Sequence, residues 1–205
     1  MSMEDYIAAR KEGIKQLHAL ESRGQDPYLP VLAELVPKLN QMAQVPLGLV
    51  QIGLDQIEGT ATKGRTTAFA RGFLPLLEQD SEFATKWSIL YDSIVEDGLR
   101  QPIVALEYYN RFYIVEGNKR VSVMRRLDAV NIEANVTRVL PEAEDSERYR
   151  VYQEFLSFYA DTKLNFIVFS REGSYERLYK LIGKTPGEKW TPEDLFDFQS
   201  CFYRF

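Results

Sequence analysis

The sequence predicts an α+β protein, in which a small mixed sheet is packed with helices and flanked by helices at both ends. Two short apolar runs, 103–107 and 112–115, are joined by Tyr108-Tyr109-Asn110-Arg111 and predict an antiparallel hairpin. Helical patterns precede and follow this hairpin instead of alternating strictly with strands. That order is typical of α+β proteins and not of repeated βαβ units.

Before the hairpin, helical periodicity is interrupted by one strand. Gly24 is a natural stop for the first helix, and Pro37 should end or kink the second because proline lacks the backbone N–H. The helix before the hairpin has the clearest buried stripe, and Asp80 or Ser81 can cap it. The elements expected here are helices at 3–22 and 31–42, a strand at 47–52, a helical turn at 55–57 and a helix that Gly98 ends.

Beyond the hairpin, the pattern predicts one strong strand and then mainly helices. Pro192 suits the first position of the last helix, with Thr191 as its cap. The expected elements are a helix at 118–128, a strand at 132–139, a helix at 146–160, a short strand at 166–169, and helices at 174–182 and 192–199.

These elements divide the chain into three expected parts. Residues 1–46 form an N-terminal helical extension, and residues 47–141 form the domain that contains the sheet. Residues 142–205 form a C-terminal helical extension packed on that domain. The length of 205 residues is sufficient for one large domain or for one domain with extra helices.

Composition excludes several classes of function. The net charge is −5, whereas a DNA binder without sequence preference is usually basic. His18 and Cys201 are the only histidine and cysteine, so one chain cannot build a zinc site from these residue types alone, and no metal ligand is predicted. No apolar leader or membrane-length apolar run is present, and we expect a cytoplasmic protein with no membrane contact.

The run Glu116-Gly117-Asn118-Lys119-Arg120 joins a buried strand to a helix start. The free N–H groups and the dipole of a helix N-terminus favour a bound anion. Gly117 permits a tight turn, Asn118 can cap the helix or meet a ligand, and the two cations suit phosphate. The sequence therefore predicts a phosphate-binding loop, against the alternative of a solvated first helical turn.

A second polar loop, residues 59–67, contains two glycines, four threonines and two cations. Thr62 and Arg65 are its candidate phosphate contacts, because hydroxyl and guanidinium groups donate hydrogen bonds. A flexible surface loop is the alternative, since the stretch lacks the full phosphate-loop pattern of NTPases.

The order of these segments resembles a known family. The polar loop ending in Arg65, then Gln101-Pro102-Ile103, then Gly117-x-x-Arg120 make the stretch from about Leu47 to Leu140 similar to the ParB/sulfiredoxin-like domain. That family includes the N-terminal domain of the partition protein ParB, sulfiredoxin and a free serine kinase. The resemblance implies the family's fold and nucleotide-phosphate contacts by Gly117 and Arg120, with Gln101 beside them.

The departures from the family pattern narrow the expected chemistry. Partition proteins usually carry an acidic residue where this chain has Asn118, which argues against CTP hydrolysis. The reactive cysteine of sulfiredoxin and the histidines of the kinase members are missing from the motif. The segment after Pro141 is acidic and aromatic where partition proteins continue into a basic helix-turn-helix, which argues against direct DNA binding.

Three functions remain in order of preference, beside the alternative of a purely structural protein with a vestigial site. The first is a nucleotide- or polyphosphate-binding module that is regulatory or controls assembly. Its expected ligands are CTP, ATP, ADP or a phosphorylated small molecule, with or without Mg²⁺, and its expected protein partner is a second copy bound through the flanking helices. The second is a nucleotide-dependent phosphotransferase with Glu116 as base, although Glu116 could instead pair with Lys119 or Arg120. A nuclease ranks last, because no cluster of carboxylates accompanies the motif.

Overall fold

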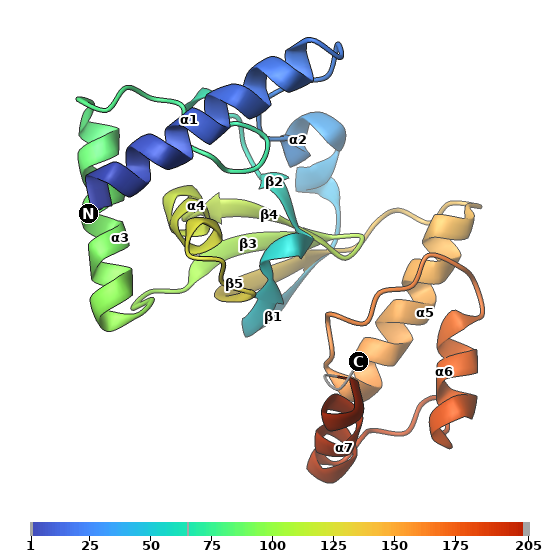
Figure 1. The fold of residues 1–205 in the computed structure, drawn as a ribbon. Helices are drawn as coiled ribbons and strands as arrows, with labels where there is room; N and C mark the ends of the chain where they lie inside the picture. Colours follow the sequence, from blue (N-terminus) through green and yellow to red (C-terminus); the bar gives the residue numbers. More distant parts are fainter. Residues whose placement is uncertain (1, 65, 203–205) are drawn as a thin grey trace. The chain divides into compact units, whose positions relative to one another are not determined.

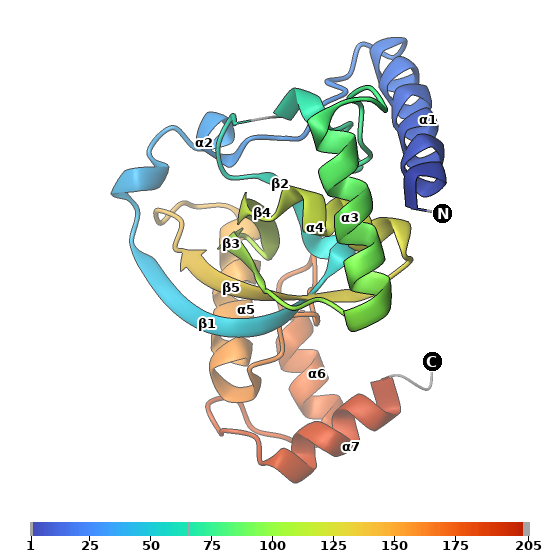
Figure 2. The same ribbon diagram turned by 90° about the vertical axis from the view of Figure 1, so that its left-hand side faces the viewer.

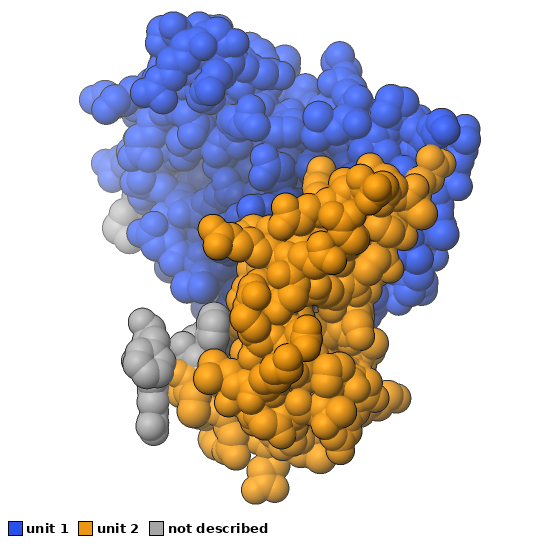
Figure 3. Space-filling view, turned by 90° about the vertical axis from the view of Figure 1, so that its right-hand side faces the viewer, with its two compact units in different colours: residues 1–140 blue, residues 141–205 orange. Residues whose placement is uncertain are grey.

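The structure is a computed structural model that describes residues 2–64 and 66–202. The chain forms two compact units, residues 1–140 and 141–205 (Figure 3). Within the described residues, seven α-helices and a five-stranded mixed sheet confirm the predicted α+β class (Figure 1). The helices are α1 (Ser2–Glu21), α2 (Leu32–Leu35), α3 (Glu82–Asp97), α4 (Asn118–Arg126), α5 (Glu147–Thr162), α6 (Ser174–Ile182) and α7 (Pro192–Phe202). The strands are β1 (Gln44–Gly53), β2 (Ile57–Thr60), β3 (Ile103–Tyr108), β4 (Arg111–Glu116) and β5 (Asn131–Val139).

The sheet has the strand order β1-β5-β3-β4-β2. β3 and β4 form the predicted antiparallel hairpin, whose turn residues Tyr109 and Asn110 have φ angles of 51° and 62°. β5 runs parallel to β3 and antiparallel to β1, whereas β2 runs parallel to β4. Because β2 and β4 point the same way, their carboxyl ends lie at the same edge of the sheet.

The main core of the first unit lies between one face of the sheet and the helices α1, α3 and α4 (Figure 2). Ile103, Ala105 and Ile114 supply the sheet side, and all three are fully buried. Trp87 of α3 is also fully buried, and its indole nitrogen donates to Ser122 Oγ of α4 at 2.9 Å. This packing fixes the start of α4 against the sheet, which matters for the site below.

The predicted helix at 31–42 is wrong in its extent. The structure has only the short α2 and a separate 3₁₀ turn at Leu39–Gln41, and Pro37 lies between them. Proline cannot donate the hydrogen bond that a continuous helix would need there. The first strand begins earlier than predicted and includes Pro46, which an edge strand such as β1 tolerates.

The second unit has α5 to α7 arranged around aromatic side chains, among them Phe158, Tyr175 and Trp190. Ser146 caps α5 by accepting from the Tyr149 N–H at 3.1 Å. The predicted strand at 166–169 is wrong, because the five strands of the described chain all lie within residues 44–139 and offer this segment no partner. No helix in the described part of the chain has the length and apolar character needed to cross a membrane.

Candidate functional site

The β4–α4 junction turns within one residue. β4 ends at Glu116, and α4 begins at Asn118. Between them, Gly117 has φ 115° and ψ 22°, in the left-handed region that glycine adopts most readily. No side chain caps α4 at this position, so the first-turn N–H groups remain available to other acceptors.

Packing requires glycine at 117 as strongly as the backbone angle does. A Cβ at this position would lie 2.6 Å from Ile103 Cγ2 and 3.2 Å from Arg120 Nε. Ile103 is fully buried at the start of β3 and has no room to move away. The short junction is therefore held in place by the neighbouring strand.

Arg120 brings together two of the segments that the sequence singled out. Its Nη1 donates to the carbonyl oxygen of Gln101 at 3.1 Å and to that of Pro102. Its Nη2 pairs with Glu116 Oε1 at 3.0 Å, so the predicted alternative of an ion pair for Glu116 is present. The Arg120 side chain is 15% exposed and that of Glu116 is 73% exposed, which leaves the carboxylate at the surface and the guanidinium behind it.

Asn118 and Lys119, the other two residues of the Gly117–Arg120 turn, differ in what they contact. Lys119 Nζ lies 4.8 Å from the centre of the Phe83 ring, a cation–π contact with α3. Asn118 Oδ1 is buried and has no hydrogen-bond partner within the described residues. An unsatisfied buried carbonyl costs about 1–3 kcal/mol, so such atoms call for an explanation and often mark a site.

The polar loop after β2 lies at the same edge of the sheet as Gly117. Thr60 stands opposite Ile114 in the parallel pair, and its hydroxyl donates to the Ile114 carbonyl at 2.9 Å. The Ala61 N–H donates to the same carbonyl at 2.8 Å, and Thr62 follows as an exposed residue. Arg65 lies outside the described residues.

Sequence reasoning missed the role of Arg125. This arginine of α4 is partly buried and donates to the carbonyl groups of Leu54, Ile57 and Gly72 at 2.9, 2.8 and 3.1 Å. Burial lowers the pKa of its guanidinium, against the opposing effect of nearby carboxylates. Arg125 thus anchors both flanks of the β2 segment to α4. Helical spacing alone marks it as a polar residue, and no sequence signal separates it from its neighbour Arg126.

Metal-ligating side chains do not gather anywhere in residues 2–64 and 66–202: no group of three or more His, Cys, Asp or Glu residues is suited to a metal ion.

Comparison with known proteins gives one family match. Residues 81–152 match the family model of the ParB N-terminal domain, which confirms the family suspected from the motifs. The match runs from the cap of α3 through the hairpin and the Gly117–Arg120 turn into α5. A solved structure, sulfiredoxin from Arabidopsis thaliana, is 22% identical over 43% of this chain and 82% of its own, with a TM-score of 0.31. No curated protein matches the chain.

Proposed function

The chain contains a ParB N-terminal-like domain, and from this premise we propose that the sheet edge at Gly117–Arg120 binds the phosphates of a nucleotide or another polyphosphate. The observation that carries the proposal is the convergence of three segments at this edge. The loop after β2, the Gln101-Pro102 segment before β3 and the start of α4 all meet there. Two of these segments were predicted as phosphate contacts from their residue types alone.

The groups at this edge are suited to an anion. The N–H groups of the first turn of α4 point out of the helix, and its dipole adds a partial positive charge. The Nη1 bonds of Arg120 go to neutral carbonyls, which a phosphate can replace as a stronger acceptor. Hydrogen bonds to charged groups contribute about 1.5–3 kcal/mol each, so a few of them support micromolar binding after association costs.

The ligand in this proposal is CTP, ATP or ADP, with or without Mg²⁺, and its binding regulates assembly. Arg120 ties α4 to the Gln101-Pro102 segment, which follows α3 after a short connection. A phosphate that draws Arg120 away from those carbonyls would break the hydrogen bonds between α4 and the Gln101-Pro102 segment. Ligand binding would then change the position of α3 relative to α4. A homodimer formed through the flanking helices is the assembly that this change would control.

Thermal unfolding with a panel of nucleotides, phosphate and pyrophosphate tests the proposal. A ligand at about 100 times its Kd should stabilise the protein by about 2.7 kcal/mol, which corresponds to a rise in Tm of roughly 5–10 °C. Arg120→Lys should remove most of this rise, because an ammonium lacks the planar fork of the guanidinium. If no member of the panel raises the Tm, the edge is not a phosphate site.

Arg111→Gln is the matched control for the arginine substitution. Arg111 is exposed at the opposite end of β4, where its Nη1 lies 3.4 Å from the Asp55 carbonyl oxygen. This variant should keep the full rise in Tm. An equal loss in both variants would show that overall charge, and not the Gly117–Arg120 turn, determines binding.

A phosphotransferase is the second candidate function, and the position of Glu116 favours it. Its carboxylate is exposed at the proposed phosphate site and held by Arg120 at 3.0 Å, where it could accept a proton from a substrate hydroxyl. Glu116→Gln should then leave the ligand-induced rise in Tm within about 2 °C of the wild-type value and lower turnover at least 100-fold. Turnover that persists in the variant would exclude Glu116 as the base.

A further inference from the structure

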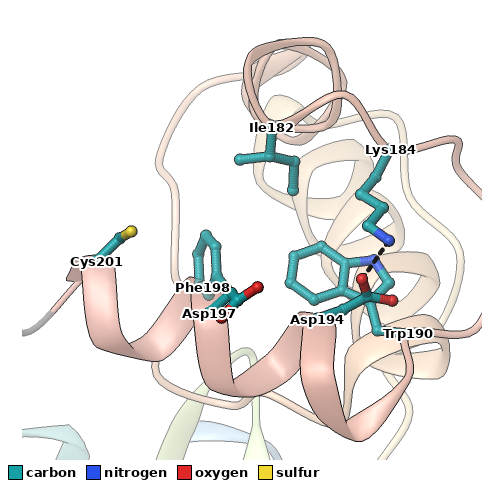
Figure 4. Close-up of a pocket in the computed structure, with 7 residues that line it drawn as sticks. All are labelled: Ile182, Lys184, Trp190, Asp194, Asp197, Phe198 and Cys201. Carbon is teal, nitrogen blue, oxygen red and sulfur yellow. Dashed lines mark hydrogen bonds and ion pairs between the residues drawn. The ribbon is translucent and has the colours of Figure 1, made fainter.

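A separate cavity lies within the second unit, between the end of α6 and the helix α7. Its volume is about 350 Å³, which is within the range of small-molecule sites. Its walls are mainly apolar, and its polar groups come from one lysine, two aspartates and a cysteine (Figure 4). The lining residues are Ile182, Lys184, Trp190, Asp194, Asp197, Phe198 and Cys201.

The indole of Trp190 forms a buried part of the cavity wall. The residue is only 8% exposed, and its Nε1 is buried with no hydrogen-bond partner among the described residues. Its backbone N–H donates to the Asp161 carbonyl at 3.1 Å, and its ring contacts those of Phe158 and Phe198. The indole is therefore held rigidly in the cavity wall while its one donor lacks an acceptor, which usually costs free energy.

Lys184 supplies further donors beside this indole. Figure 4 shows the Trp190 ring between Phe198 and Lys184. The Lys184 ammonium donates to Asp194 Oδ1 at 2.5 Å, which uses one of its three N–H groups. Asp194 Oδ2 accepts from the Thr191 N–H at 2.9 Å, so both oxygens of this carboxylate are engaged. Lys184 thus has two further N–H donors on this side, which a ligand acceptor can take in place of water.

Asp197 gives the lining of the cavity one net negative charge. The hydrogen bond from Lys184, followed by those with Thr191, lowers the pKa of Asp194 to about 2, so the Lys184–Asp194 pair is neutral overall. Asp197 is exposed on the same helix and makes no ion pair within residues 2–64 and 66–202. A free carboxylate next to unused donors suits a ligand with an acceptor and a cation on the same small molecule.

We propose that this cavity binds a free α-amino acid with an apolar side chain. The ligand's carboxylate accepts from Lys184 beside the Trp190 indole, and its ammonium pairs with Asp197. Its side chain lies against Ile182 and Phe198, which supply the apolar wall. The site is in a different unit from the phosphate site, so either proposal stands if the other fails.

Nuclear magnetic resonance of the 205-residue chain can test this directly, because the chain has two tryptophans. Titration with L-leucine, L-methionine and L-phenylalanine, each to about 10 mM, should shift the Trp190 indole N–H resonance. The Trp87 indole already donates to Ser122 and should not shift. Trp190→Phe identifies the resonance. A Trp190 signal that none of the three moves overturns the proposal.

Ligand analogues and variants test the two charged contacts separately. 4-Methylpentanoate and isoamylamine share the carbon skeleton of leucine but lack its amine or its carboxylate, and each should bind at least tenfold more weakly than L-leucine. Equal binding of either analogue contradicts the zwitterion assignment. Asp197→Asn should weaken L-leucine binding about tenfold, whereas Glu193→Gln, on the same helix but outside the cavity lining, should not. An equal loss in both variants would also overturn the assignment.

Discussion

Replacing Gly117 with alanine should destabilise the first unit by about 3 kcal/mol or more. The left-handed backbone at φ 115° costs a non-glycine residue roughly 1–3 kcal/mol, and the contact of a new Cβ with Ile103 Cγ2 adds about 1–3 kcal/mol of overpacking. For a unit of this size we expect a fall in Tm of roughly 6–12 °C. The Trp87 indole resonance, followed during thermal unfolding, reports this unit separately from the second.

A double-mutant cycle separates the two causes. Ile103→Leu removes Cγ2 but keeps the side-chain volume, so the double variant should recover the packing part of the loss and not the backbone part. Gly64→Ala is the control, because a Cβ there meets no atom within 4 Å and Gly64 has no positive φ. Strict additivity of Gly117→Ala and Ile103→Leu would mean that the contact with Ile103 contributes nothing.

Glu107→Ala should be the most damaging single substitution of a charged residue in the first unit, with a loss of about 3–5 kcal/mol. The Glu107 side chain is 1% exposed, accepts from the Asn110 N–H at 2.7 Å and pairs with Arg138, which is 6% exposed. Truncation removes the carboxylate that pairs with the buried Arg138 guanidinium. Chemical denaturation, followed at the Trp87 resonance, measures the change in the free energy of unfolding.

Two variants show whether the cost comes from the orphaned charge. Glu107→Leu with Arg138→Met removes both charges and should be several kcal/mol less destabilised than Glu107→Ala. Glu133→Gln changes an exposed carboxylate on β5 and should alter stability by less than about 0.5 kcal/mol. A double variant as unstable as Glu107→Ala would mean that lost packing, and not the broken ion pair, causes the damage.

The hairpin and the long helices could be predicted because their signals are local. The apolar runs at 103–107 and 112–115 and the cap at Ser81 act within a few residues of themselves. β2 was taken for part of a polar loop, because its four residues include Gly59 and Thr60 and its strand geometry comes from pairing with Ile114 far along the chain. The opposite error occurred at 166–169, where apolar residues have strand propensity but no strand to pair with.

The residues of the candidate site and the Glu116–Arg120 ion pair were predictable, but the backbone partners of Arg120 were not. Spacing identified Gly117 and Arg120, but it could not show that the Arg120 guanidinium reaches the carbonyls of Gln101 and Pro102. The cavity beside Trp190 could not be predicted from the sequence for a similar reason. It depends on how the end of α6, the loop that carries Trp190 and α7 pack together, and an aromatic sequence alone contains no such information.

The helix α4 holds two separate segments of the first unit. Arg120 in its first turn holds the Gln101-Pro102 segment, and Arg125, five residues later, holds the carbonyl groups of Leu54, Ile57 and Gly72. These segments are therefore linked through one short rigid body. A small tilt of α4 would move both at once, so we expect them to shift in a single cooperative step and not one by one.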